Sequence, residues 1–366
     1  MRFAFFIHSL VSCWNNGNAH FLRGIVRALQ KAGHHVRVYE PQGSWSLTQL
    51  LADQGEAGLA PMRRIYPDLK ARTYHAGSNF EHLVGDCDVV IAHEWTEPWA
   101  LDALARARRN RHFLFLFHDT HHRAVSDPAR LHGAWMNDCD GILVFGASLA
   151  DVYTKKNWHD RIFVWHEAAD TSVFKPPAIE TIRHGLVFIG NWGDNERNAA
   201  LGQFLLRPAQ ASGSPLDIFG VRYPASACGI LAAHSAHYRG FVANADVPSR
   251  FAHYRATIHI PRSFYVRHLP GIPTIRVFEA LACGIPLLSA PWADDEELFT
   301  PDSFIMARTN REMERAMQSI LHDDDLWHYL SKNGLQQIQS RHSCAVRAQE
   351  LINIIDTLRP QETRVA

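Results

Sequence analysis

The sequence predicts an α/β protein made of two domains, each built on a parallel sheet, and three observations carry this prediction. A length of 366 residues corresponds to roughly two domains at about 150 residues per domain. Short apolar runs bounded by Gly, Asn, Asp or His alternate with longer amphipathic stretches, which is typical of βα units. A content of 46% hydrophobic and 20% charged residues is ordinary for a globular protein, so extensive disorder is excluded.

The first half of the chain contains six short, nearly continuous apolar runs. Such runs are expected for strands whose two faces are both covered by helices. Between the first two runs, a helical stripe from Phe21 to Leu29 leads to Gly33, a residue suited to close a helix, and this completes one βαβ unit. The predicted strands are residues 2–7, 35–40, 88–93, 112–117, 141–145 and 161–165.

Lys175, Pro176 and Pro177 interrupt this alternation, and a second series of strands follows them. We therefore predict a first domain over residues 1–168, a linker over 169–182, a second domain over 183–342, a helix over 343–358 and a tail over 359–366. In open α/β sheets, ligands bind beyond the carboxyl ends of the strands, so the residues after each strand are candidate site residues. The predicted strands of the second domain are residues 185–189, 216–219, 256–260, 285–289 and 303–306.

The charge balance argues against one class of function. The chain has 37 basic and 37 acidic residues, a net charge of zero, whereas nucleic-acid binding draws on a surplus of Lys and Arg. No apolar run approaches the ~18 residues of a membrane-spanning helix. The start of the chain lacks a signal-peptide cleavage pattern, and the scattered cysteines fit reduced thiols. We expect a cytoplasmic protein with no nucleic-acid partner and at most peripheral membrane contact.

Residues 256–290 carry the most information, because they read as strand, long loop, helix and strand. Pro273 lies near the predicted helix start and Gly284 closes the helix. Free N–H groups and the positive end of the helix dipole favour a phosphate at such a start. The backbone amides that cluster there belong to Gly271, Ile272, Thr274 and Ile275.

Glu279 lies one to two turns into this helix, where its carboxylate can accept hydrogen bonds from ribose hydroxyls. Arg276 lies three residues earlier and is its neighbour on the helix surface. The competing interpretation of Glu279 is a solvated glutamate that pairs with Arg276. Arg276 itself is either a contact to phosphate or acceptor, or a packing partner.

Four segments of the chain resemble one enzyme family. PTIRVFEALACGIPLLSAP resembles the nucleotide-sugar-binding segment of GT-B glycosyltransferases, particularly the spore-maturation CgeB-like branch related to glycosyltransferase family 4. The other three segments are YRGFVANADVPSRFAHYRATIHI, RHSCAVRAQELI and AADTSVFKP. The resemblance covers about residues 165–356, while the first half matches only in its general pattern.

The resemblance implies a GT-B fold with two facing Rossmann-like domains and a C-terminal helix that packs back on the first domain. It also implies transfer of a sugar from a UDP- or GDP-linked donor to a hydroxyl group, with retention of configuration and without a metal or other cofactor. The acceptor is left open between a glycan, a lipid-linked sugar, a protein and a small molecule.

The resemblance further implies donor-binding residues. Glu279 binds the ribose, the backbone at Phe241 and Val242 lies beside the base, and amides around Thr274 and Ile275 hold the diphosphate. One departure concerns Gly271, which stands where the family often has a second glutamate in contact with the donor sugar. Three further residues are expected near the diphosphate, namely Gly190, Asn191 and Arg197.

Three predicted strands of the first domain end in His followed by an acid, and the pairs are His93-Glu94, His118-Asp119 and His166-Glu167. By resemblance, His118 contacts the donor sugar or the acceptor. Asp119 is either a general base that deprotonates the acceptor hydroxyl or a helix N-cap. The remaining acceptor-side candidates are Asn16, Gly17 and His93.

Two alternatives from other classes stay open at this point. His118, His121 and His122 lie close in sequence, so a metal-dependent hydrolase could use them as imidazole ligands. A non-catalytic GT-B-like protein that only binds nucleotide sugars is the other.

Overall fold

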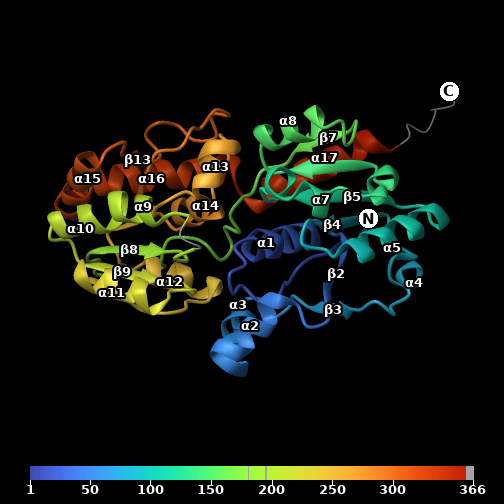
Figure 1. The fold of residues 1–366 in the computed structure, drawn as a ribbon, viewed down its shortest axis with the longest axis horizontal. Coiled ribbons are helices and arrows are strands. Elements are labelled where there is room, and N and C mark those ends of the chain that lie inside the picture. Colours follow the sequence, from blue (N-terminus) through green and yellow to red (C-terminus); the bar gives the residue numbers. More distant parts are fainter. Residues whose placement is uncertain (180, 194–195, 360–366) are drawn as a thin grey trace. The chain divides into compact units, whose positions relative to one another are not determined.

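The computed structural model describes residues 1–179, 181–193 and 196–359 and divides the chain into two compact units (Figure 1). Among the described residues, unit 1 comprises Met1–Leu59, Tyr66–Glu167 and Cys344–Arg359. Unit 2 comprises Ala60–Ile65 and Ala168–Ser343. Of the predicted tail, residues 360–366 lie outside the described residues.

Unit 1 is built on a seven-stranded parallel sheet with the strand order β3-β2-β1-β4-β5-β6-β7. The order reverses between β1 and β4, so loops beyond these two strands flank a switch point where α/β sheets bind ligands. The strands are β1 (Arg2–Phe6), β2 (His35–Pro41), β3 (Ala71–Tyr74), β4 (Val89–His93), β5 (Leu114–Asp119), β6 (Gly141–Val144) and β7 (Ile162–Val164).

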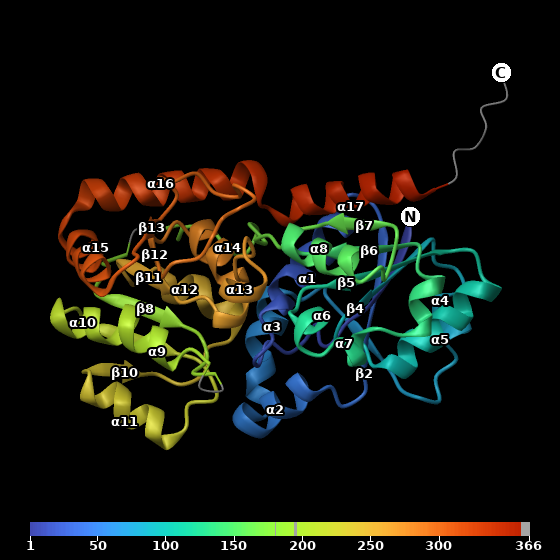
Figure 2. The ribbon, with the colours of Figure 1, turned by 45° about the horizontal axis from the view of Figure 1, so that its top comes forward.

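The helices of unit 1 include one from the end of the chain, α17 (Cys344–Leu358), which packs along α1 (Asn18–Lys31) (Figure 2). Trp165 Nε1 donates to the Arg347 carbonyl over 2.9 Å, and Arg347 Nε donates to the His166 carbonyl over 3.1 Å. The other helical segments are α2 (Trp45–Gln54), η1 (Gly55–Leu59), α4 (Phe80–Val84), α5 (Pro98–Asn110), α6 (Arg123–Ser126), α7 (Pro128–Leu131), η2 (Ala134–Asp138) and α8 (Ala147–Lys155).

Unit 2 is built on a six-stranded parallel sheet with the order β10-β9-β8-β11-β12-β13, which reverses between β8 and β11. Its strands are β8 (Leu186–Ile189), β9 (Leu216–Phe219), β10 (Ala236–Tyr238), β11 (Ala256–His259), β12 (Leu287–Ser289) and β13 (Ile305–Met306). Its helical segments are α3 (Ala60–Ile65), α9 (Asn198–Leu201), η3 (Gly202–Leu206), α10 (Arg207–Ala211), α11 (Ala225–Ala233), η4 (Asn244–Asp246), α12 (Val247–Phe251), α13 (Ser263–His268), α14 (Ile275–Ala282), α15 (Asn310–His322) and α16 (Asp324–Arg341).

The predicted fold class and all eleven predicted strands are confirmed, whereas β3 and β10 were not predicted. Both are edge strands: β3 buries only its last residue and β10 only its first. The predicted strands in the middle of each sheet are apolar because helices cover both faces, and this signal is missing where most of a strand is exposed.

Two further findings concern the chain as far as it is described. None of its helices is long and apolar enough to cross a membrane. All six cysteines lie within the described ranges, and no disulfide joins any of them.

Candidate functional site

Glu279 lies on the buried side of α14 and contacts polar side chains of unit 2. The helix buries Ile275, Phe278 and Leu281 as its apolar stripe, and Glu279 is buried with them at 0% exposure. Its Oε2 pairs with Nη1 of Arg276, and its Oε1 accepts a hydrogen bond of 2.5 Å from Nδ2 of Asn244. A buried carboxylate requires such partners, since it has left water. The solvated alternative is therefore wrong in one respect: Glu279 does pair with Arg276, but away from solvent.

The start of α14 is linked to the sheet through a buried histidine. Thr274 is the N-cap residue, yet its hydroxyl makes no capping bond to the helix; it lies 3.1 Å from Nε2 of His259. Nδ1 of His259 lies 2.9 Å from the Ser289 hydroxyl, which donates to the Ala290 carbonyl. Ser289 therefore accepts from Nδ1–H, and Thr274 donates to Nε2 of a neutral ring.

His259 is neutral, and the first turn of α14 has no side-chain cap. Burial, together with the nearby Arg197 and Arg276, lowers the pKa of His259 to about 3. By contrast with Thr274, the N-caps Thr309 and Asp323 accept hydrogen bonds from the N–H three residues on in α15 and α16. The first turn of α14 thus differs from these two starts in having no side-chain cap.

Arg197, Asn191 and Gly190 meet beyond the carboxyl ends of β8 and β11. Arg197 donates to the carbonyl of Asn191 and, over 3.3 Å, to that of Ile260. Oδ1 of Asn191 accepts from the Val221 N–H over 3.1 Å, and Gly190 N–H donates to the Phe219 carbonyl over 2.9 Å. Burial lowers the pKa of Arg197, but the guanidinium stays charged at neutral pH.

Gly271 adopts a left-handed backbone conformation with φ of +88°, and its N–H donates to the Ala293 carbonyl over 3.0 Å. Any other residue is strained in this conformation. A Cβ built on Gly271 would lie 3.6 Å from Oε1 of Glu296. Glycine is therefore suited to position 271, where the family often has a glutamate. The carboxylate of Glu296 lies beside this position.

Phe241 and Val242 are half-buried and follow the end of β10. They precede Asn244, which contacts Glu279. The segment expected beside the base therefore continues into Asn244, which contacts Glu279, the residue expected at the ribose.

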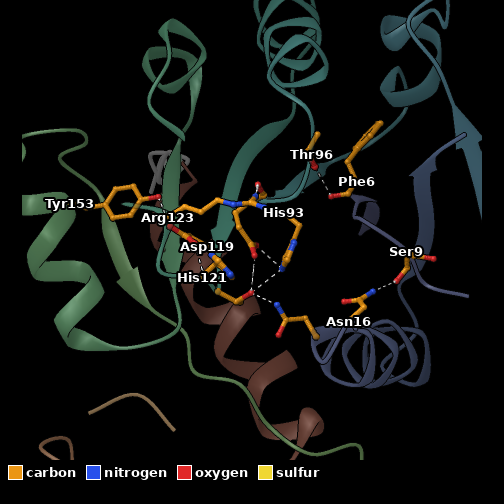
Figure 3. A network of polar contacts seen from close by, with 12 residues as sticks. Phe6, Ser9, Asn16, His93, Thr96, Asp119, His121, Arg123 and Tyr153 are labelled. Carbon is orange, nitrogen blue, oxygen red and sulfur yellow. Dashed lines mark hydrogen bonds and ion pairs between the residues drawn. The ribbon is translucent and has the colours of Figure 1, made fainter. Parts of the chain in front are cut away.

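A second polar cluster lies beyond β4 and β5 in unit 1 (Figure 3). The Thr120 hydroxyl is hydrogen-bonded to Asn18, lies 3.1 Å from Nε2 of His93 and 3.4 Å from the nearer carboxylate oxygen of Glu94. Nε2 of His93 is also 2.8 Å from Oε2 of Glu94. Arg123 donates to the Glu94 carbonyl over 3.1 Å. His93, which was predicted on the acceptor side, therefore belongs to this cluster of buried polar groups.

Asp119 is fully buried, and its two oxygens accept from separate donors. Tyr153 Oη donates over 2.8 Å and the His121 N–H donates over 2.9 Å (Figure 3). Helix α6 begins later, and its N-cap is His122. The N-cap alternative for Asp119 is therefore wrong, and its role as a general base stays a prediction. Burial, and for Asp119 also the negative charge of Glu94, raises the pKa of both acids.

His118 lies inside the core of unit 1. Its ring packs against those of Phe21, Trp165 and His93 at 5.9, 4.8 and 5.3 Å, and it is 1% exposed. Neither ring nitrogen has a hydrogen-bond partner among the described residues, and burial lowers the pKa of the ring well below its usual range. A contact between His118 and a substrate stays a prediction, which this packing does not favour.

Asn16 and Gly17 shape the loop between β1 and α1. Nδ2 of Asn16 donates to the carbonyls of Ser9 and Ser12 over 3.2 Å each (Figure 3), and Gly17 is the N-cap of α1. The Asn16 amide thus holds the loop, and its acceptor-side role stays a prediction.

Sequence reasoning missed the polar residues that lie next to those it named. Asn244 and His259 were not singled out, because only the folded chain shows that they contact Glu279 and Thr274. Glu94 was seen as half of a His-acid pair, but not as the neighbour of Asp119. Arg123, whose guanidinium lies 3.6 Å over the Trp95 ring, had no sequence signal.

The histidines of residues 118–122 do not form a metal site in the part of the chain that is described, where no group of three or more His, Cys, Asp or Glu side chains could hold a metal ion. His118 is in the core, and Nδ1 of His122 lies 2.8 Å from the Ser126 hydroxyl. The geometry does not favour the metal-dependent hydrolase.

Each half of the chain matches a glycosyltransferase family. Residues 15–173 match the family described as Glycosyltransferase Family 4, and residues 197–353 match the family described as Glycosyl transferase-like. No curated protein sequence matches the chain. The assignment to the CgeB-like branch stays a prediction.

Solved structures share the whole fold at low sequence identity. An alpha-glucosyltransferase in complex with UDP-glucose and DNA containing an abasic site has a TM-score of 0.77 at 13% identity, over 97% of this chain and 99% of that chain. Sucrose-phosphate synthase from Thermosynechococcus elongatus has 0.67 at 14%, over 98% and 99%. An Anabaena protein in complex with UDP and glucose has 0.66 at 12%, over 98% and 100%. These likenesses establish the GT-B fold.

Proposed function

We propose, from the premise that the chain consists of two glycosyltransferase domains in a GT-B fold, that it transfers a sugar from a nucleotide-diphospho-sugar to a hydroxyl group. The donor would bind to unit 2, beyond the strand ends where β8 and β11 reverse the strand order. Unit 1 would supply groups for the acceptor.

The observation that carries this proposal is the buried carboxylate of Glu279, held by Arg276 and Asn244. A ribose presents two neighbouring hydroxyl donors, and an ionised carboxylate is an acceptor with two oxygens. Hydrogen bonds to a charged acceptor in a water-poor site are stronger than those between neutral groups. Glu279 is therefore suited to hold the ribose of a nucleotide.

Positive charge for the diphosphate would come from the uncapped start of α14 and from Arg197 and Arg276. Amides at a helix N-terminus and fixed arginines stabilise the charge that develops on a leaving diphosphate. We therefore propose that no metal is required, with Thr274, Ile275 and Gly271 as the backbone neighbours of the phosphates. Activity that is unchanged by a chelator would agree with this, and its loss would contradict it.

UDP is the proposed nucleotide, because the GT-B structures cited above include complexes with UDP-glucose and with UDP. Phe241 and Val242 would lie beside the base. Retention of configuration is part of the proposal, supported by the family-4 match of residues 15–173. We also propose a CgeB-like specificity. The proposed location is the cytoplasm, and the scattered cysteines support this location.

The acceptor is proposed to be a glycan, a lipid-linked sugar, a protein or a small molecule bound beside unit 1. Asp119 is proposed beside the acceptor hydroxyl, where it would be the base if the configuration were inverted, with His118, His93, Asn16 and Gly17 as neighbours. The zero net charge argues against a nucleic-acid acceptor, although four of the similar structures contain DNA.

The test of this function is a thermal-shift screen over UDP-, GDP- and other nucleotide sugars, since a ligand that binds the folded state raises the unfolding temperature. A rise with UDP-sugars, followed by release of UDP on addition of acceptor pools, would support transfer. Stabilisation without UDP release from any acceptor would favour a non-catalytic binding protein. No stabilisation by any nucleotide sugar would refute the donor site.

A further inference from the structure

Asn244 contacts Glu279 from outside its helix. It begins η4, in the connection from β10 to α12, and is separated from Glu279 by 35 residues. Asn244 is 7% exposed and Glu279 0%, so the bond between Nδ2 and Oε1, 2.5 Å long, is shielded from water. A hydrogen bond to a charged group in such a place is worth more than one at the surface.

Two donors to Glu279 come from different elements. Arg276 lies on α14 itself, three residues before Glu279, and binds Oε2. A partner on the same helix moves with that helix and leaves the carboxylate free to rotate about its last bond. Asn244 adds a second point of attachment at Oε1 from a separate segment, so the plane of the carboxylate is fixed.

The chemistry of the carboxamide makes this contact specific. Only the NH₂ end of Asn244 can face a carboxylate oxygen, because its carbonyl end would repel it. A carboxylate has about four acceptor positions, so one held by two donors can still accept from a diol. A fixed carboxylate plane favours two hydroxyls at a fixed spacing, and the neighbouring hydroxyls of a ribose have such a spacing.

We propose that Asn244 is a positioning residue that orients Glu279 for the ribose diol and so makes the protein prefer ribonucleotides to deoxyribonucleotides. This inference rests on the proposed donor site in unit 2. Because Asn244 follows Phe241 and Val242 in the same connection, it also links the segment proposed beside the base to the ribose-binding carboxylate. Binding of the base and of the ribose is therefore coupled through Asn244.

The experiment compares Asn244→Ala with the wild-type protein in calorimetric titrations with UDP and with 2′-deoxy-UDP. The wild type should bind UDP about tenfold or more tightly than 2′-deoxy-UDP, the effect of a lost hydrogen bond to a charged group. In Asn244→Ala the affinity for UDP should fall by about tenfold, while that for 2′-deoxy-UDP stays within about twofold. The ratio of the two affinities is the diagnostic quantity, because a merely structural role would weaken both nucleotides equally.

Two further variants keep the test independent of folding. Asn244→Ser retains a short hydroxyl donor and should restore part of the ratio, whereas Asn244→Asp places a second carboxylate against Glu279 and should abolish it. The matched control is Asn310→Ala, because Nδ2 of Asn310 donates to the Gln203 carbonyl over 2.9 Å in the same unit. The control should leave the ratio unchanged.

The outcomes separate the inference from the function on which it rests. If the wild type binds neither UDP nor any nucleotide sugar, the donor site itself is wrong. If the wild type binds UDP and discriminates against 2′-deoxy-UDP, but Asn244→Ala discriminates equally well, only the role of Asn244 is refuted. A collapsed ratio in Asn244→Ala, with partial rescue by Asn244→Ser, supports it.

Discussion

In both units, polar residues cluster beyond the carboxyl ends of sheet strands. The two clusters differ in the charge state of their buried carboxyl groups. In unit 2, the carboxylate of Glu279 is buried as an ion pair with Arg276. In unit 1, Glu94 and Asp119 are buried near each other, and burial raises the pKa of both acids. The difference indicates that unit 2 keeps a fixed negative charge while unit 1 retains protons. A carboxylate that accepts from a ribose needs the first, whereas a carboxyl group with a raised pKa is a stronger base once it is ionised.

The largest expected effect tests the fixed charge in unit 2. Glu279→Ala removes the proposed ribose acceptor and leaves Arg276 without its carboxylate, so the affinity for UDP-sugar should fall by about 2–3 kcal/mol, or about 30- to 150-fold. Glu94→Gln should leave this affinity within about twofold. Calorimetric titration of both variants decides the point, and equal losses would remove the contrast between the units.

The next effect is a pH dependence of stability that originates in unit 1. The folded protein holds protons on Glu94 and Asp119 up to a pKa of about 8, whereas the unfolded chain releases them near pH 4. Between about pH 7 and pH 8, where the buried histidines are neutral in both states, the free energy of unfolding should therefore fall as the pH rises, at up to about 1.4 kcal/mol per pH unit for each extra proton held. Urea titrations across this range measure the slope.

Asp119→Asn should flatten that slope, because the amide carries no titrating proton. Asp151→Asn is the matched control, since Asp151 is exposed on α8, with 70% of its side chain accessible. A slope that persists in Asp119→Asn and Glu94→Gln alike would show that these two acids are ionised in the folded protein.

A smaller effect is expected at the hydrogen-bond chain of Thr274 and His259. Thr274→Val keeps the shape but loses the hydroxyl that donates to His259, which should cost about 1 kcal/mol in UDP binding. Uridine, which lacks the diphosphate, should bind equally well to both proteins. Thr274→Ser should restore the affinity, and an equal loss for uridine and UDP would contradict a role at the diphosphate.

The smallest effect concerns Gly271 and needs no ligand. Its φ of +88° is costly for a residue with a Cβ, so Gly271→Ala should lower the free energy of unfolding by about 1 kcal/mol. Gly229→Ala, at a helical glycine of α11 with nothing within 4 Å of a built Cβ, should instead raise it by about 0.5–1 kcal/mol. Changes of the same sign in chemical denaturation would contradict the assigned backbone conformation.

The sequence predicted the fold well because the central strands are continuous apolar runs, as in β4, where all five residues are buried. It predicted Glu279 through a motif on one helix. It could not predict Asn244 or His259, since each contacts a residue that only folding brings near.

His118 shows a second limit of prediction from the sequence, which concerns the direction of a side chain. The position of a strand end can be predicted, but successive side chains point to opposite faces. His93 and His118 are register partners on β4 and β5, and both rings therefore lie on the same face of the sheet, in contact with each other. Asp119, one residue further on, points the other way and reaches Tyr153.

The central claim is that the donor nucleotide binds to unit 2 at α14 and the segment after β10. Hydrogen–deuterium exchange with and without saturating UDP tests it most directly, because bound phosphate and base protect the backbone amides that they contact. A donor site in unit 2 predicts slower exchange in residues 241–244 and 274–279, with residues 93–94 and 118–120 unchanged. Protection confined to unit 1, or saturable UDP binding without protection of residues 274–279, would contradict it.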